Sequence, residues 1–212
     1  MITLPVYNSE GKEIEKLKVD EATLGGRVRY ALLKQAIVMY HANKRVGTAA
    51  TKSRSMVEGS TRKFYAQKHT GNARMGNIRT AKRVGGGVTF AKAARDFSQQ
   101  MPKKQRLLAR ASALLAKLLS NNVVVVDNLK FEKPRTKDFA AVLNNLKIDR
   151  SCLVVINNYD EKLWKSARNI QKVSMLLAAE SNAGDICSRT KLLFTKDAFL
   201  SLAGKDKGKT EN

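Results

Sequence analysis

Residues 103–126 read KKQRLLARASALLAKLLSNNVVVV, and this stretch decides the fold. Its leucines and alanines recur every three or four positions, which is the spacing of one apolar helix face. The spacing predicts a helix over 103–120 that ends at Asn121–Asn122. Four consecutive valines follow, and an apolar β-branched run of this length is typical of a short strand that is buried on both faces.

The same alternation of apolar strand and amphipathic helix continues to residue 204. Three further apolar runs predict strands over 153–156, 172–177 and 191–195. Helices are predicted before, between and after them, over 135–147, 160–170, 181–188 and 195–204. Continuously apolar strands joined by helices form a parallel sheet with helices on both faces and right-handed crossovers. The sequence therefore predicts an α/β fold with a mainly parallel sheet and a Rossmann-like topology.

The chain before residue 103 combines a globular part with a segment of different character. A strand near 2–6 and a helix over 24–43 show ordinary apolar spacing. Farther on, apolar periodicity is lost over some 50 residues, and seven of the 13 glycines of the chain fall there. The predicted organisation is one α/β domain made of 1–43 and 96–204, an extended arm over 44–95 that is inserted in it, and a polar tail over 205–212.

The arm is also the most basic part of a basic protein. The 212 residues include 40 Lys and Arg against 18 Asp and Glu, which gives a net charge of +22. The arm alone has 13 basic residues and one acidic residue, Glu58, for a net charge of +12. Such an excess of like charge repels itself unless a polyanion neutralises it. Nucleic acid is therefore the leading expected partner, and an anionic membrane surface is the second.

Several classes of protein disagree with the sequence. An apolar content of 43% is too high for a wholly disordered basic chain. No apolar run approaches the roughly 20 residues that cross a bilayer, and the N-terminal residues lack the apolar stretch of a signal peptide. The two cysteines, Cys152 and Cys187, form no disulfide framework, and neither cysteine nor histidine spacing matches a metal site. We expect an intracellular protein without a metal or a cofactor.

A nucleotide-dependent enzyme is the main alternative, because parallel α/β sheets often bind nucleotides. A dinucleotide site needs a glycine-rich turn after its first strand, whereas DNLKFEKP after Val126 has no glycine. The segments GTAATKS at 47–53 and GNARMGN at 71–77 each match only part of a phosphate-binding P-loop. No serine elbow is present, and His41 and His69 have no catalytic partner nearby in the sequence. We predict that the protein is not an enzyme and has no catalytic residue.

The composition of the arm favours RNA over DNA as the ligand. DNA readers usually present a helix or a β-ribbon to the major groove, and the arm has neither pattern. An irregular, glycine-rich backbone suits the crevices of folded RNA, where arginine planes fit among phosphates and unstacked bases. Phe64, Tyr65 and Phe90 are available for stacking. The residues predicted to bind RNA are Lys44, Arg45, Lys52, Arg54, Arg62, Lys63, Lys68, Arg74, Arg79, Lys82, Arg83 and Arg95.

Four short motifs follow one another along the arm. They are GT-x-x-x-K-S-R at 47–54, V-x-G-S at 57–60, QK-x-TG-x-AR-x-G at 67–76 and GGVTF at 86–90. In this order, together with the helix KKQRLLARASALLAKL, they resemble the universal L-four family of large-subunit ribosomal proteins in its bacterial type. Each motif alone is weakly specific, but their order and the length of the chain agree over nearly the whole sequence.

The resemblance implies a structural, non-enzymatic constituent of the large ribosomal subunit in the cytoplasm. The globular domain would lie at the subunit surface, and the arm would run through the 23S-type rRNA to help form the constriction of the peptide exit tunnel. The implied partners are this rRNA, neighbouring large-subunit proteins and the nascent peptide, with no membrane partner and no homo-oligomer. Some members of the family also repress their own operon by binding its messenger leader RNA, which is a further implied role.

The arm tip differs from the usual family sequence. The departures are Phe64 for Pro, Tyr65 for Trp, Ala66 for a basic residue, His69 for Gly and Asn72 for Arg. Two charges are therefore absent, and a histidine stands where the family has the most permissive residue. The resemblance assigns the tunnel tip to Gln67, Lys68, His69, Thr70, Gly71, Asn72 and Ala73.

Overall fold

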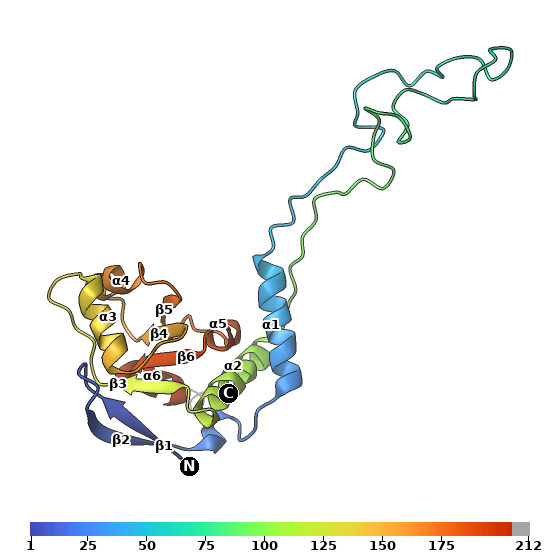
Figure 1. Cartoon of the computed structure of the whole chain (residues 1–212). Coiled ribbons are helices and arrows are strands. Elements are labelled where there is room, and N and C mark those ends of the chain that lie inside the picture. The colour runs from blue at the N-terminus through green and yellow to red at the C-terminus, as the bar shows by residue number, and fades with distance from the viewer. Residues whose placement is uncertain (205–212) are drawn as a thin grey trace. The chain divides into compact units, whose positions relative to one another are not determined.

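The computed structural model describes residues 1–204, and the predicted polar tail over 205–212 lies outside the described residues. The chain separates into two units: Met1–Tyr40 with the chain from Gln100 onward, and His41–Gln99. The first unit contains the sheet (Figure 1). The elements in chain order are β1 (Ile2–Tyr7), β2 (Glu13–Val19), η1 (Glu21–Leu24), α1 (Tyr30–Lys44), α2 (Lys103–Leu119), β3 (Val123–Val126), α3 (Thr136–Asn145), β4 (Cys152–Ile156), α4 (Glu161–Ala167), β5 (Val173–Leu177), α5 (Ala183–Ser188), β6 (Lys191–Thr195) and α6 (Lys196–Gly204).

A six-stranded sheet in the order β2-β1-β3-β6-β4-β5 forms the centre of the first unit. The pairs β1·β3, β3·β6, β6·β4 and β4·β5 are parallel, and β2 pairs antiparallel with β1. The mainly parallel sheet predicted from the apolar strand runs is confirmed. Parallel strands of this kind are buried on both faces, which is why Cys152–Ile156 is buried at all five positions.

Helices cover both faces of the central strands, and alternate strand residues point into two separate hydrophobic clusters. On β6, Leu192 and Phe194 pack with residues of α2, α5 and α6, whereas Leu193 packs with residues of α3 and α4. The connections through α3 and α4 move one way along the sheet, and the connection through α5 returns on the opposite face. Because the α5 connection reverses both its direction along the sheet and the face on which it lies, all three connections have the same handedness. This arrangement is typical of a doubly wound sheet. The predicted α/β fold with Rossmann-like topology is confirmed.

The second strand is an element that the sequence pattern does not predict. The stretch EIEKLKV forms β2 at the edge of the sheet, with Val19 as its buried residue. An edge strand needs only one apolar face, and its charged side chains disfavour pairing with another chain. The side chain of Asn8 orders the β1–β2 turn by accepting hydrogen bonds from the N–H groups of Glu10 and Lys12. The charged residues of this strand therefore mask the apolar periodicity from which a strand would be predicted.

The predicted helix over 24–43 is wrong at its beginning. A short 3-10 helix, η1, ends at Gly25, and α1 begins only at Tyr30. Gly25 and Gly26 have φ angles of 85° and 66°, which a right-handed helix cannot include. The predicted helix over 181–188 is confirmed in a shorter form, since α5 begins after Asn182, whose side chain accepts from the N–H of Asp185.

Candidate nucleic-acid interface

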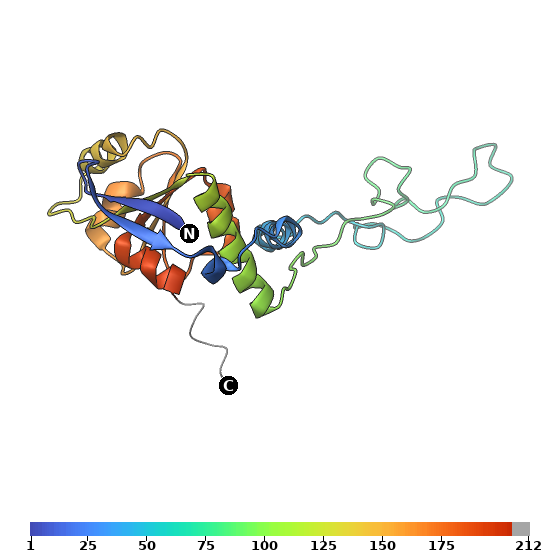
Figure 2. The same cartoon turned by 90° about the horizontal axis from the view of Figure 1, so that it is seen from below.

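The second unit, His41–Gln99, contains the whole predicted arm and has no strand and no helix beyond the last turn of α1. Its outgoing and returning backbones run side by side (Figures 1 and 2). The N–H of Arg95 donates to the carbonyl of Gly47 at 3.2 Å, and the N–H of Thr51 donates to the carbonyl of Lys92 at 2.9 Å. Hydrogen bonds between the two legs, rather than an apolar core, therefore give this unit its local order.

Glycines stand where the two legs approach most closely. A Cβ atom on Gly87 would lie 2.2 Å from the backbone nitrogen of Arg54, and one on Gly47 would lie 2.1 Å from the carbonyl oxygen of Arg95. Real Cβ atoms do not come this close to backbone atoms, so a side chain at either position would push the legs apart. Gly87 is also the buried residue of the unit. The glycines of GGVTF and of the GT motif thus have a packing role.

Near the base of the unit, two arginines enclose an aromatic ring. The guanidinium carbon of Arg45 lies 3.9 Å from the ring centre of Phe97, and that of Arg95 lies 4.2 Å from it. Both distances are well within the range of cation–π attraction. These three side chains and Lys92 line a hollow of about 670 Å³. The stacking on Phe97 was not predicted from the sequence, because Arg45 lies some 50 residues away along the chain.

Farther out, a loop is closed around the side chain of Lys63. Its ammonium group donates to Gln67 Oε1 at 2.7 Å and to the carbonyl of Met75 at 2.8 Å. The N–H of Phe64 donates to the carbonyl of Gly76 at 3.0 Å. The loop therefore has local hydrogen bonds of its own, and two of the predicted site residues, Lys63 and Gln67, are brought together.

The three aromatic residues predicted to stack on bases lie in different surroundings. Phe64 and Tyr65 pack edge to face with ring centres 5.5 Å apart, and the guanidinium of Arg83 lies 4.8 Å from the ring centre of Phe64. Phe90 is 92% exposed and touches no other ring among the described residues. Phe90 therefore presents the most open stacking surface of the three, and Arg83 already stacks on an aromatic plane.

The residues assigned to the tunnel tip include two left-handed backbone positions. His69 has φ of 69° and Gly71 has φ of 70°. Glycine adopts this conformation without strain, whereas a side chain at the same φ costs about 1 kcal/mol. His69 stands where the family usually has glycine, so its φ angle gives a physical reason for the glycine.

All twelve residues predicted to bind RNA lie in the second unit, and most are exposed. Arg79 and Arg83 are half-buried, while the other ten are exposed. Within residues 1–204, none of the twelve is in an ion pair. Arg45 and Arg95 meet at one ring, whereas Lys68 and Arg74 contact no other predicted site residue through a hydrogen bond in the described chain. The unit presents a long series of separate, uncompensated cations.

The switch point of the sheet, where a doubly wound fold would bind a nucleotide, is built differently. It lies where β3 and β6 end side by side, because their following helices go to opposite faces. β6 runs directly into α6 with no intervening loop. The ammonium group of Lys196 lies 2.5 Å from a carboxylate oxygen of Glu15, and this hydrogen bond raises the pKa of Lys196. Lys196 is thus ion-paired at the carboxyl end of β6, and the segment DNLKFEKP after β3 has no glycine-rich loop.

Comparison with known proteins shows the family of this chain. The family model described as "Ribosomal protein L4/L1 family" matches residues 17–205. The chain belongs to this family. The large ribosomal subunit protein uL4 of Carboxydothermus hydrogenoformans is 43% identical over 95% of this chain and 98% of its own length. The proteins of the same name from Pelotomaculum thermopropionicum and Symbiobacterium thermophilum are 43% and 42% identical over 93% and 95% of this chain, and over 96% and 98% of their own lengths.

Family membership decides between the two classes of protein that the sequence leaves open. Members of the L4/L1 family are ribosomal proteins, which are structural and not catalytic. The prediction of a non-enzymatic protein of the bacterial L-four type is therefore confirmed. Among residues 1–204, no helix is long and apolar enough to cross a membrane. The same residues contain no group of three or more His, Cys, Asp and Glu side chains that could hold a metal ion.

Proposed function

We propose that this protein is a structural constituent of the large ribosomal subunit in the cytoplasm and that its second unit binds large-subunit rRNA. The relatives that cover nearly its whole length have this subunit in their names. The observation that supports rRNA binding most strongly is the state of the arm cations, since within residues 1–204 none of them has an anionic partner. A polyanion would remove their mutual repulsion and release its own counterions.

The backbone of the second unit supports folded RNA as this polyanion. A major-groove reader needs a helix or a ribbon, and residues 45–99 form neither. Irregular RNA offers phosphates and unstacked bases as contacts. The irregular legs of the unit, with exposed guanidinium groups and the open ring of Phe90, suit such contacts. The guanidinium planes of Arg45 and Arg95 lie on the ring of Phe97, and their outer faces are suited to stacking with RNA bases. DNA binding is the alternative that this geometry disfavours.

The proposal extends to the peptide exit tunnel. Residues Gln67–Ala73 would form the tip that narrows the tunnel and faces the nascent peptide, with neighbouring large-subunit proteins as further partners. Support comes from the left-handed φ angle at His69, which matches a glycine position of the family motif. Lys68 is exposed at this tip and has no ion-pair partner among the described residues. Repression of its own messenger RNA stays a prediction from the resemblance.

Changing Arg54, Arg62 or Arg74 to Gln tests rRNA binding by the arm. Each variant should weaken binding of the purified full chain to 23S-type rRNA and lower the slope of log K against log salt by roughly 1 per lost phosphate contact. The melting temperature should stay unchanged, because these side chains are exposed and lie outside the two hydrophobic clusters. Filter binding at several salt concentrations and thermal melting give the two readouts.

Matched variants on the first unit serve as the control. Lys137 and Lys162 are exposed lysines on α3 and α4, so changing each to Gln removes the same charge far from the arm in sequence. The proposal is contradicted if these controls lower the salt slope as much as the arm variants do. It is also contradicted if the wild-type chain fails to sediment with large subunits after a moderate-salt wash.

A further inference from the structure

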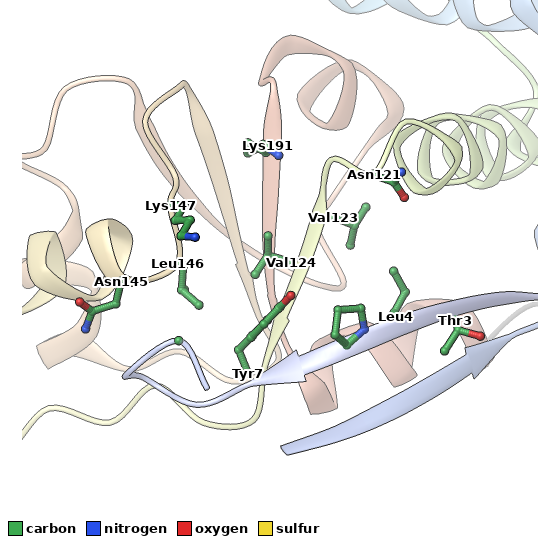
Figure 3. Close-up of a pocket in the computed structure, with 12 residues that line it drawn as sticks. Thr3, Leu4, Tyr7, Asn121, Val123, Val124, Asn145, Leu146, Lys147 and Lys191 are labelled. Atoms are coloured by element: carbon green, nitrogen blue, oxygen red, sulfur yellow. The ribbon is translucent and has the colours of Figure 1, made fainter. Parts of the chain in front are cut away.

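On the face of the sheet that α3 and α4 cover, no helix among residues 1–204 lies over β1. Helices α3 and α4 cover the central strands on their face, but β1 lies toward the sheet edge beyond α3. A groove of about 470 Å³ opens there, between β1 and the loop that follows α3 (Figure 3). This volume lies within the roughly 300–1,000 Å³ range of small-ligand sites. The groove is therefore large enough to hold one nucleotide.

The floor of the groove is partly apolar. Figure 3 shows Tyr7 extending from β1 toward Val124 of β3. Leu146, in the loop that follows α3, also lines the groove. Pro5 lies beside Tyr7 on the same strand face, and all four side chains are half-buried. An aromatic ring next to a proline offers a flat, sequence-tolerant surface on which a base can stack.

The rim of the groove is cationic. Lys147 and Lys191 line it, no Asp or Glu lines it, and neither lysine is in an ion pair within residues 1–204. The strand register places Lys18 and Lys16 of β2 directly opposite Thr3 and Pro5 on this face and Glu13 opposite Tyr7, so β2 adds two cations and one carboxylate. Lys16 lies 3.6 Å from Glu13, but both side chains are exposed, so water and salt weaken this pair.

Two amides complete the lining. Asn121 reaches the groove from the end of α2 and Asn145 from the end of α3. The Nδ2 group of Asn145 donates to the carbonyl of Ser9 at 3.2 Å, which leaves its Oδ1 atom as a hydrogen-bond acceptor. Amide groups of this kind can pair with the edge of a base or with a ribose hydroxyl. The groove thus combines cations, a stacking surface and neutral hydrogen-bonding groups.

We propose that this groove is a second RNA site, which takes one nucleotide of a single-stranded segment. The phosphates lie between Lys147 and Lys191, and the base stacks on Tyr7 and Pro5. The inference rests on the proposed function, because it assumes an RNA partner. An acidic protein segment fits less well. β1 pairs with β3 only through Val6 and Tyr7, and in the part of β1 that β3 leaves unpaired Pro5 has no N–H to donate to an added peptide strand.

A titration of the ¹⁵N-labelled full chain with the pentanucleotide U5 tests the site. The amide signals of Tyr7, Val124 and Leu146 should shift in a saturable manner. The double variant Lys147→Glu/Lys191→Glu should weaken this binding about tenfold or more, and Tyr7→Leu should weaken it severalfold by removing the stacking ring. The matched control Lys137→Glu/Lys162→Glu has the same net charge and should bind as the wild type does.

The outcomes separate this proposal from the proposed function. Shifts confined to 44–95 would overturn the groove site and leave rRNA binding by the arm intact. Shifts confined to the groove would support the groove site, and filter binding of the arm variants with 23S-type rRNA decides the proposed function separately. Equal binding of inorganic polyphosphate with no effect of Tyr7→Leu would overturn the nucleotide assignment. Groove shifts with hexaglutamate but not with U5 would identify a protein partner instead. If the double variant fails to fold, Lys147→Gln gives the same test with a single neutral change.

Discussion

Two fully buried serines show how a single hydroxyl can act in opposite ways. Ser112 on α2 and Ser166 on α4 are both 0% exposed. The hydroxyl of Ser166 donates to the carbonyl of Lys162 at 2.8 Å and accepts from the N–H of Arg135 at 3.1 Å. The hydroxyl of Ser112 has no hydrogen-bond partner within residues 1–204. A buried polar group without a partner costs free energy, whereas a satisfied one helps to hold its neighbours.

We expect Ser112→Ala to raise the free energy of unfolding by up to about 1 kcal/mol. The change removes an unpaired hydroxyl and introduces the residue with the highest helix propensity. Ser166→Ala is the matched control and should lower the free energy of unfolding by roughly 1–2 kcal/mol, because it leaves a backbone N–H of Arg135 unpaired. Urea denaturation followed by circular dichroism measures both. Destabilisation of Ser112→Ala to the same extent as the control would contradict the argument.

At the proposed tunnel tip, Lys68→Glu should alter the passage without preventing assembly. The arm keeps twelve basic residues in this variant, so the large subunit should still form. The new carboxylate would repel the rRNA phosphates that Lys68 is proposed to contact, and the constriction should change shape. Inhibition of the variant ribosomes by macrolide antibiotics, which bind in the upper tunnel, should differ from the wild type. Unchanged inhibition together with an unchanged tunnel in a cryo-EM map would refute the assignment.

At the scale of elements, different interactions stabilise each of the two units internally. The sheet packs alternate side chains into two hydrophobic clusters, and burial of this kind is the main source of stability in globular proteins. The legs of the second unit instead rely on close backbone contacts that glycine permits. A Gly→Ala change in the second unit should therefore disturb the backbone where the new methyl group would meet backbone atoms. The same change should be tolerated where the methyl group would meet open space or a flexible side chain.

Gly87→Ala should separate the two legs and weaken rRNA binding about tenfold, which is roughly 1.4 kcal/mol. Its Cβ would lie 2.2 Å from the nitrogen of Arg54, and this backbone cannot move aside as a side chain could. Gly76→Ala is the control, because its Cβ would lie 3.6 Å from a methyl group of Thr80, an ordinary contact. Filter binding of both variants gives the comparison. Equal affinities of the two variants for rRNA would show that the close approach of Gly87 to the backbone of Arg54 is not needed for binding.

At the scale of the whole molecule, the hydrophobic core is confined to one of the two units. The first unit contains all the residues of both hydrophobic clusters. The second unit exposes large apolar side chains such as Val84, at 105%, and Phe90, at 92%. A segment with few buried apolar contacts has little local stability of its own. The second unit should therefore depend on its RNA partner for a fixed conformation, as segments that fold on binding do.

Limited proteolysis of the free protein checks this expectation. Trypsin should cut first within 44–95, where 13 Lys and Arg residues occur, and should leave the sheet unit intact for longer. Addition of 23S-type rRNA should protect the same sites. A protease that does not need basic residues, such as thermolysin, controls for the abundance of tryptic sites. Equal resistance of the two units in the free protein would contradict the argument.

The sequence by itself determined the class of the fold and the part of the chain that is proposed as the interface. Apolar runs such as Val123–Val126 are buried on both faces in any arrangement, so their alternation with amphipathic helices required a parallel sheet. The same holds for the arm, since a net charge of +12 without apolar periodicity cannot form a core. These properties depend on composition and local spacing, which do not change when the chain folds.

Only the tertiary structure decided which distant residues meet. The edge strand β2 is recognisable by its pairing with β1 rather than by its own pattern. The stacking of Arg45 on Phe97 joins two legs that are far apart in sequence. The groove beside Tyr7 combines residues from β1, β3, β6 and the ends of α2 and α3. Such contacts follow from strand order and chain crossings, which are set by the packing of the whole chain and leave no local signal in the sequence.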